Sequence, residues 1–289
     1  RVHPTINTVG ARTGRTSCQN PNLQQLPAAK DTYGIRECFH APKGKSIICL
    51  DFSQIEIRVM AIFSKDEAMS QILRDPHGDI HQQTADRFQV DRSPVAKQIN
   101  FLQLYAGGAF AMANKLTMEG APTTPEQAQS YIQRYNEVYP GVIARRKEWL
   151  REHQRNGYVQ YLLGNKRFLL DVDWSSKREM HKAETVLSNN LCQGSAQQML
   201  KCAIVRADPM CLNPDRAVLS RMTFSRLHTL KIRDLGYRLE KLRREFRLAK
   251  LEWAIQVHDE NLYSVDTAAA EDIAPKVADI MTWVPYFEP

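Results

Sequence analysis

The sequence predicts an α+β fold in which helices dominate and a few short strands carry acidic residues. Apolar positions recur at helical spacing over most of the 289 residues. The two clearest strand-like runs lie beside acids, in KSIICLDF (45–52) and around VHDE (257–260). The hydrophobic content of 43% is ample for one large domain or two subdomains.

The pattern in the first third of the chain predicts a strand, then an acidic residue, then a helix. Residues 1–30 read as irregular, because they are rich in Asn, Gln, Thr and Pro. The run 45–52 reads as a buried strand ending at Asp51, with Cys49 as a small core residue, and a helix follows it. Two further helices are expected at 79–88 and at 93–108, the second with Ser93 as N-cap, Pro94 at its first position and its end at Gly107–Gly108.

The remaining elements are mostly helical. The pattern predicts helices at 123–138, 141–155 and about 176–206, a hairpin at 158–170 that turns at Gly164–Asn165, the VHDE hairpin, and a last helix at 268–281.

Positive charge is concentrated in one segment. The net charge of +7 and the pI near 9.1 suggest a polyanionic partner. Residues 216–250 hold eleven Lys or Arg against three acids, and their apolar positions recur at steps of four and three. This predicts an amphipathic helix with a basic outer face that includes Arg243, Arg244 and Arg247. It is either an arm that grips duplex phosphates or a solvated helix packed on the fold.

Several classes of protein are disfavoured. The six cysteines include no C-x-x-C pair, which argues against zinc ribbons and redox motifs and fits a reduced, intracellular setting. No apolar run approaches 18 residues, and no secretory leader is present, so we expect no membrane partner. We also expect a cytoplasmic location and a monomer. The chain begins at Arg1 and reads as a fragment of a longer protein.

Two acids lie far apart in the sequence but in similar positions. Asp51 ends one strand, and Asp259 stands at a hairpin tip 208 positions later. If both strands share one small sheet, the carboxylates lie side by side and suit Mg²⁺. Two such ions can activate an attacking oxygen and stabilise a leaving one. Alternatively, Asp51 caps the following helix, and Asp259 and Glu260 are solvated turn residues.

A third feature is a stripe on the expected helix 93–108. Lys97, Phe101 and Tyr105 are spaced four residues apart, so they share one helix face. A cation followed by two aromatic rings suits a nucleotide, with phosphate at the lysine and a base stacked on the rings. The alternative is an amphipathic core helix with one snorkelling lysine.

Three segments in order resemble the polymerase motifs of family A DNA polymerases, the group of bacterial DNA polymerase I: DFSQIEIR (51–58), KQINFLQLY (97–105) and QVHDE (256–260). Four other segments resemble further parts of that family: TGRTSCQNPNLQQLP (13–27), DIHQQTA (79–85), YPGV (139–142) and CQGSAQQMLK (192–201). The resemblance covers residues 1–205 and 252–289.

This resemblance implies a right-hand polymerase fold with a small antiparallel palm sheet and helical fingers. The palm would comprise 1–60 and 176–289, with a basic insertion at about 207–250, and the fingers 61–175. The thumb and the exonuclease would belong to the full-length protein outside this chain.

The resemblance also implies an activity. It is template-directed addition of deoxynucleotides from their triphosphates to the primer 3′-hydroxyl on primer–template DNA, with two Mg²⁺ ions for which Mn²⁺ can substitute. The setting would be a bacterial or phage-infected cell. The alternatives are a fragment that binds primer–template without turnover and an RNA polymerase of the same architecture.

Site residues follow from the same resemblance. Asp51, Asp259, Glu260 and the carbonyl of Phe52 would bind metal, and Lys97 would join Asp51 and Asp259 in catalysis by holding the triphosphate. Glu56 would exclude ribonucleotides by crowding the 2′ position. The other nucleotide contacts would be Gln54, His81, Arg92, Phe101 and Tyr105, and the DNA contacts would be Arg15, Asn22, Gln24, Gln193 and His258.

Three positions depart from the family pattern. Ser93 stands where the family usually has an arginine, and Arg92 is one residue away, or about 100° around a helix. Leu102 replaces a usual glycine, and Thr185 replaces an arginine near the template. These departures bear on triphosphate affinity and fidelity more than on activity.

Overall fold

The computed structural model describes residues 2–26, 33–75, 77–208, 238–257 and 259–282. The chain divides into two compact units, each with its own hydrophobic core. Unit 1 comprises residues 1–53 and 197–289, and unit 2 comprises residues 54–196. The long helix α8 (Lys177–Ala207) contributes to both.

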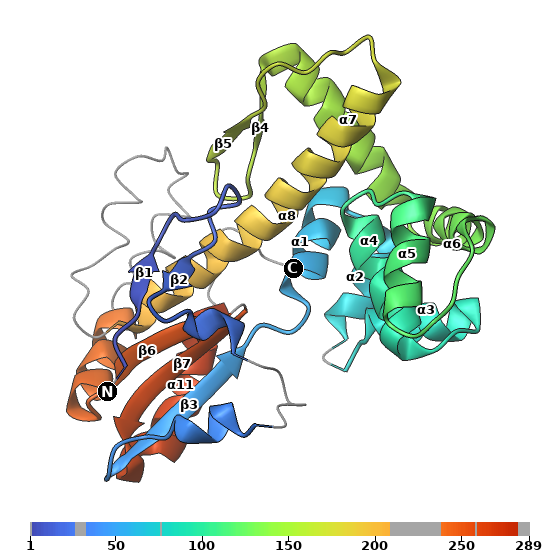
Figure 1. The fold of residues 1–289 in the computed structure, drawn as a ribbon. Coiled ribbons are helices and arrows are strands. Elements are labelled where there is room, and N and C mark those ends of the chain that lie inside the picture. Colours follow the sequence, from blue (N-terminus) through green and yellow to red (C-terminus); the bar gives the residue numbers. More distant parts are fainter. Residues whose placement is uncertain (1, 27–32, 76, 209–237, 258, 283–289) are drawn as a thin grey trace. The chain divides into compact units, whose positions relative to one another are not determined.

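Unit 1 is built on a three-stranded antiparallel sheet (Figure 1). Its strand order is β3 (Lys45–Asp51), β7 (Glu260–Asp266) and β6 (Glu252–Val257). The two outer strands are therefore both paired to β7, although β3 is separated from it by about 200 residues of chain.

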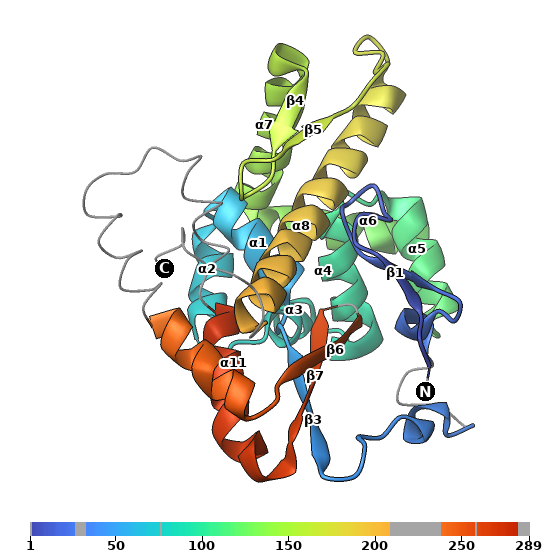
Figure 2. The same cartoon turned by 90° about the vertical axis from the view of Figure 1, so that its left-hand side faces the viewer.

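One face of this sheet packs against helix α11 (Ala270–Thr282), as Figure 2 shows. Val277 and Ile280 of that helix lie with Ile48 and Val265 in the core of unit 1. The other face of β3 is open, so the expectation of a fully buried strand is wrong for alternate residues. Cys49, which we expected in the core, is exposed, because strand side chains alternate between faces.

The amino-terminal segment forms a short hairpin and a 3₁₀ turn within residues 1–30, where we expected irregular chain, and a second 3₁₀ turn after it. The hairpin pairs β1 (Thr5–Asn7) with β2 (Ser17–Gln19). The Lys201 ammonium of α8 donates to the carbonyls of Thr8 at 2.5 Å and Gly14 at 2.6 Å, which anchors the hairpin loop. The 3₁₀ turns are η1 (Leu23–Gln25) and η2 (Ile35–Cys38).

The basic amphipathic helix is present over residues 238–248, and residues 209–237 of the expected insertion lie outside the described residues. Leu239 and Phe246 are buried in the core of unit 1, as predicted. The expectation for Arg243 is wrong: it is 2% exposed and donates to the carbonyl of Val205 at 3.4 Å. It lies four residues after Leu239 and three before Phe246, on the same buried stripe. Arg244 and Arg247 are exposed.

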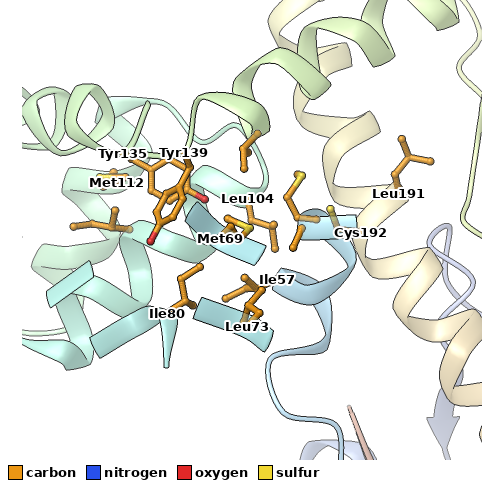
Figure 3. Packing of buried hydrophobic residues seen from close by; sticks show 14 of the residues in the cluster. Ile57, Met69, Leu73, Ile80, Leu104, Met112, Tyr135, Tyr139, Leu191 and Cys192 are labelled. Carbon is orange, nitrogen blue, oxygen red and sulfur yellow. The ribbon is translucent and has the colours of Figure 1, made fainter. Parts of the chain in front are cut away.

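Unit 2 is a helical unit with one small hairpin of β4 (Tyr158–Gln160) and β5 (Lys166–Phe168). Its core gathers side chains such as Ile57, Leu104, Tyr135 and Leu191, as Figure 3 shows. None of the helices in the described part of the chain is long and apolar enough to span a membrane. Apart from α8, the helices of this unit are α1 (Ile55–Ser64), α2 (Glu67–Arg74), α3 (Ile80–Phe88), α4 (Lys97–Leu104), α5 (Ala109–Met118), α6 (Pro125–Val138) and α7 (Pro140–Asn156).

Local sequence signals explain several helix ends. Thr124 and Gln127 form a capping box at the start of α6. The expected helix 93–108 is wrong at both ends. Helix α4 begins at Lys97, after a π-helical turn η3 (Arg92–Ala96) that begins before Ser93, and it ends at Leu104 instead of at the glycine pair. Ala106 adopts a left-handed conformation with φ of 58°, and the Gly107 amide donates to the Leu102 carbonyl at 2.7 Å, which closes the helix early.

Candidate active site

The register of β3 and β7 brings the two predicted acidic segments together in unit 1. Asp51 lies directly opposite Glu260. One step further, the backbone amide of Phe52 donates to the backbone carbonyl of Asp259 at 3.1 Å. All four residues expected to bind metal therefore lie at one end of one sheet. His258 lies outside the described residues.

The two faces of the sheet differ in chemistry at this end. Asp51, Glu260 and Val257 occupy paired positions and share one face, whereas Gln256 and Asn261 share the other. Cys49 lies two residues before Asp51 and therefore on the same face as Asp51 and Glu260. Although the residue is exposed, partial desolvation of its thiol, and then the negative charge of Glu260, raise the pKa of Cys49.

The donor chemistry at this edge fits Mg²⁺. Carboxylate and carbonyl oxygens are hard ligands, and Mg²⁺ usually takes one or two carboxylates and fills its other positions with water and substrate phosphates. Within the described ranges, no three or more His, Cys, Asp and Glu side chains gather in a group that could hold a metal ion by themselves.

In unit 2, helix α4 carries the predicted cation and aromatic stripe. Lys97 is exposed and Phe101 is half-buried, while Ile99 and Leu104 turn into the core. Tyr105 follows as the first residue after the helix. Lys97 is therefore exposed to solvent, whereas Phe101 and Tyr105 are partly buried against the core of unit 2. The nucleotide role of this stripe stays a prediction.

His81 of α3 lies beside this stripe. Its ring centroid is 5.5 Å from that of Phe101, and its Nδ1 accepts a hydrogen bond from Asn100 Nδ2 at 3.1 Å. Asn100 is itself fixed by the Thr84 hydroxyl at 3.0 Å. Because Nδ1 accepts, the ring proton resides on Nε2.

The charge state of His81 is set mainly by burial. Its side chain is 5% exposed, and desolvation lowers its pKa to about 4. Asp79 opposes this change, whereas the positive charges of Arg92 and Lys97 add to it. At neutral pH the ring is uncharged and is a hydrogen-bond donor through Nε2.

Arg92 is held in place by a residue that sequence reasoning missed. Its Nε and Nη2 contact Asp79 Oδ2 at 2.8 and 2.5 Å. The other oxygen of Asp79 caps α3 by accepting from the His81 amide at 2.8 Å. The pKa of Asp79 lies below its usual value. Burial is the largest single influence and raises the pKa, but the hydrogen bonds from Arg92 and from two backbone amides together lower it by more. An Asp before a predicted helix can be recognised in a sequence as an N-cap, but the ion pair of Asp79 with Arg92 cannot be recognised there.

A second group of predicted site residues lies at the start of α1, with Gln54 and Glu56, and on α8, with Gln193. Glu56 is 5% exposed. The pKa of the fully buried Cys192 is raised by burial and, secondly, by the charge of Glu56. Gln54 precedes the helix in a left-handed conformation with φ of 53°. On α8, Gln193 Nε2 donates to the Tyr105 hydroxyl at 3.4 Å.

The predicted DNA contacts in unit 1 take part in local structure. Asn22 Oδ1 accepts from the Gln24 amide and caps η1. Gln24 Nε2 donates to Thr16 Oγ1 at 2.9 Å and to the Gln256 carbonyl at 3.0 Å. Arg15 lies in the hairpin loop just before β2. Of these residues, Gln24 contacts β6, and both Gln24 and Asn22 use side-chain groups for hydrogen bonds within unit 1.

Comparison with known proteins gives one consistent family. The model of DNA polymerase family A matches residues 1–288. DNA polymerase I of Treponema pallidum (strain Nichols) is 36% identical over 215 residues, and thermostable DNA polymerase I of Thermus aquaticus is 30% identical over 293 residues. The alignments cover 71% and 98% of this chain, but the chain spans only 21% and 30% of these curated relatives.

A solved structure agrees with these relatives. The POL domain of Pol1 from M. smegmatis, in complex with DNA primer-template and dNTP, superposes with a TM-score of 0.74 and 26% sequence identity. The match covers 97% of this chain and 44% of that one.

Proposed function

We propose, since the chain belongs to DNA polymerase family A, that it catalyses template-directed addition of deoxynucleotides to a primer 3′-hydroxyl. The observation that carries this proposal is the β3–β7 register, which places Asp51 and Phe52 beside Asp259 and Glu260. The α+β fold with a small antiparallel sheet is that of a polymerase domain.

We assign unit 1 to the palm and unit 2 to the fingers. The compact units divide at residues 53 and 196, whereas the sequence suggested 60 and 175. A thumb and an exonuclease in the longer protein, a monomeric state and a cytoplasmic setting in a bacterial or phage-infected cell stay predictions.

In this proposal Asp51 and Asp259 hold the metal ions, with the Phe52 carbonyl as a further ligand. Two bound Mg²⁺ ions, replaceable by Mn²⁺, would lower the pKa of the primer hydroxyl and offset charge on the leaving pyrophosphate. Glu260 lies opposite Asp51 in the strand pair, so we assign it a supporting place at the rim of the site. Because nucleotidyl transfer needs positioning and electrostatic stabilisation, no cysteine or serine is required as a nucleophile.

The incoming triphosphate would contact α3 and α4. Lys97 supplies an exposed positive charge, and it can also donate a proton to the departing pyrophosphate. His81 would donate from a neutral Nε2–H. Arg92 would approach the phosphates from its ion pair with Asp79, which fixes its direction.

The sugar and the base would lie against Glu56, Phe101 and Tyr105. A buried carboxylate at Glu56 disfavours a 2′-hydroxyl by occupying its space, which argues for deoxynucleotides over ribonucleotides. Gln54 would support the same pocket wall. The proposed DNA contacts are Arg15, Asn22, Gln24, Gln193 and His258.

Primer extension tests the proposal. The unmodified chain is compared with Asp51→Ala and Asp259→Ala in Mg²⁺ with four deoxynucleoside triphosphates. Metal stabilisation of several kcal/mol predicts a loss of roughly 10³-fold in each variant. Asp279→Ala, which removes an exposed acid on α11, is the matched control and should extend normally.

Extension that survives either active-site substitution would contradict the metal-site assignment. An unmodified chain that binds primer–template but does not extend it would favour the alternative, a binding fragment.

A further inference from the structure

Three glutamines and a threonine in unit 1 form a hydrogen-bonded cluster on the sheet face opposite Asp51 and Glu260. We call Thr16, Gln24, Gln197 and Gln256 the amide cluster. Gln197 Nε2 donates to Gln256 Oε1 at 3.2 Å, and Gln256 Nε2 donates back to Gln197 Oε1 at 3.3 Å. Thr16 Oγ1 also donates to Gln256 Oε1 at 3.2 Å. Gln24 completes the cluster through Thr16 and the Gln256 carbonyl.

Both central glutamines are almost inaccessible to solvent. Gln197 is 3% exposed and Gln256 is 2% exposed. A buried amide that loses its partner cannot replace it with bulk water, so each misplaced glutamine is costly. The reciprocal pair therefore favours one position of β6 relative to α8, because hydrogen bonds depend on both distance and angle.

The cluster lies on the sheet face opposite the carboxylates. Gln256 is paired with Asn261 on β7, and both point away from the face of Asp51 and Glu260. Asn261 is itself completely buried. The contact between α8 and the end of β6 is therefore polar at Gln197 and Gln256, although the same face is apolar further along at Ile48 and Val265. Hydrogen bonds at this end restrict sliding more than an apolar contact would.

The position of β6 decides the position of Asp259. Gln256 is three residues before Asp259, and Val257, the last residue of β6, is paired with Glu260. Any shift of the β6 end would move the turn that brings the Asp259 carbonyl to the Phe52 amide.

We propose that Gln197 is a positioning residue for the polymerase reaction. Through its amide pair with Gln256 it holds the end of β6, and therefore Asp259, beside Asp51. The inference rests on the proposed function, in which Asp51 and Asp259 hold the metal ions. Gln197 itself touches neither metal nor substrate in this assignment.

The test uses Gln197→Met, which keeps the side-chain length and removes the amide. Gln198→Met is the matched control, because it makes the same change one residue along α8, where the Oε1 atom has no hydrogen-bond partner among the described residues. Both variants are compared with the unmodified chain by amide hydrogen exchange and by single-nucleotide incorporation at varied Mg²⁺ concentrations.

Gln197→Met should accelerate amide exchange in peptides spanning residues 252–262. It should also raise the Mg²⁺ concentration for half-maximal incorporation about tenfold, the lower end of the effects seen when groups behind metal ligands are removed. The KM for the deoxynucleotide should stay unchanged. Gln198→Met should change none of these quantities.

A double variant separates positioning from packing. Gln197→Met/Gln256→Met removes both amides of the pair, so thermal stability should recover relative to the single variant. The altered Mg²⁺ dependence should remain, because the directional link is still missing. Recovery of both quantities would assign Gln197 a packing role and overturn the proposal.

Unchanged exchange and Mg²⁺ dependence in Gln197→Met would also overturn it, as would equal changes in Gln198→Met. Hydrogen exchange is measured without DNA or metal. If the unmodified chain fails to extend primers, the proposed function fails, while the exchange rates still decide whether Gln197 holds β6.

Discussion

The ion pair of Arg146 offers a quantitative test of how helix α4 is anchored in unit 2. Arg146 lies on α7 and is 7% exposed. Its Nη1 donates to the carbonyl of Gln103 at 2.6 Å, and its Nε is 3.1 Å from Glu184 Oε1 on α8. One guanidinium thus joins three helices of unit 2 at the end of α4, two residues before Tyr105.

Replacing Arg146 with Met should destabilise unit 2 by about 3 kcal/mol. The hydrogen bond from a charged donor to Gln103 contributes about 1.5–3 kcal/mol. Breaking a fully buried ion pair costs about 3–5 kcal/mol. The two figures are not added, because one guanidinium makes both contacts. Glu184 is 19% exposed, so water partly solvates the carboxylate that remains, and the expected loss lies at the lower end of the range for an ion pair.

Urea unfolding followed by tryptophan fluorescence measures this change, because Trp149 is fully buried one turn along α7. Arg151→Met, an exposed arginine on the same helix, should change stability by less than about 0.5 kcal/mol. The double variant Arg146→Met/Glu184→Met should recover part of the loss, because no buried charge is left unpaired. Equal midpoints for Arg146→Met and Arg151→Met would refute the reasoning.

Three further predictions concern α1, α3 and α4. Glu56→Ala should admit ribonucleotides, measured as the ratio of kcat/KM for the two sugars, and an unchanged ratio would exclude Glu56 as the barrier. Lys97→Met should lower kcat/KM for nucleotides about 10²-fold, whereas Lys115→Met on α5 should not, so equal losses would remove Lys97 from the triphosphate site. Because His81 has a folded pKa of about 4 against about 6.5 unfolded, the unfolded chain binds more protons between these values. Stability should therefore fall by about 2–3 kcal/mol as pH drops from 6.5 to 4, and His81→Asn should flatten that slope; an equal slope in both would contradict the assignment.

Local patterns predicted much of the fold and of the candidate site. The strand before Asp51, the helix after it and the hairpin at Asp259 all follow from periodicity and turn signals. The same reasoning put Lys97 and Phe101 on one helix face. Each of these features depends on residues a few positions apart.

Contacts between segments far apart in the sequence could not be predicted from local patterns. The Arg146–Glu184 pair and the Gln197–Gln256 pair each join elements separated by 38 or more positions, and no periodic pattern marks them. Arg243 is a different case, because its spacing from Leu239 and Phe246 already placed it on the buried stripe. The position of Arg243 in the helix therefore predicts burial, although its charge predicts exposure.

The central claim is that Asp51 and Asp259 form one metal site. It is tested most directly by the rate of single-nucleotide incorporation in Asp51→Ala, Asp259→Ala and the variant with both changes. Residues that act as a unit have strongly non-additive effects. The account predicts that each single variant loses nearly as much rate as the double variant. Losses that multiply, or a single variant that keeps most of its rate, would contradict one shared site.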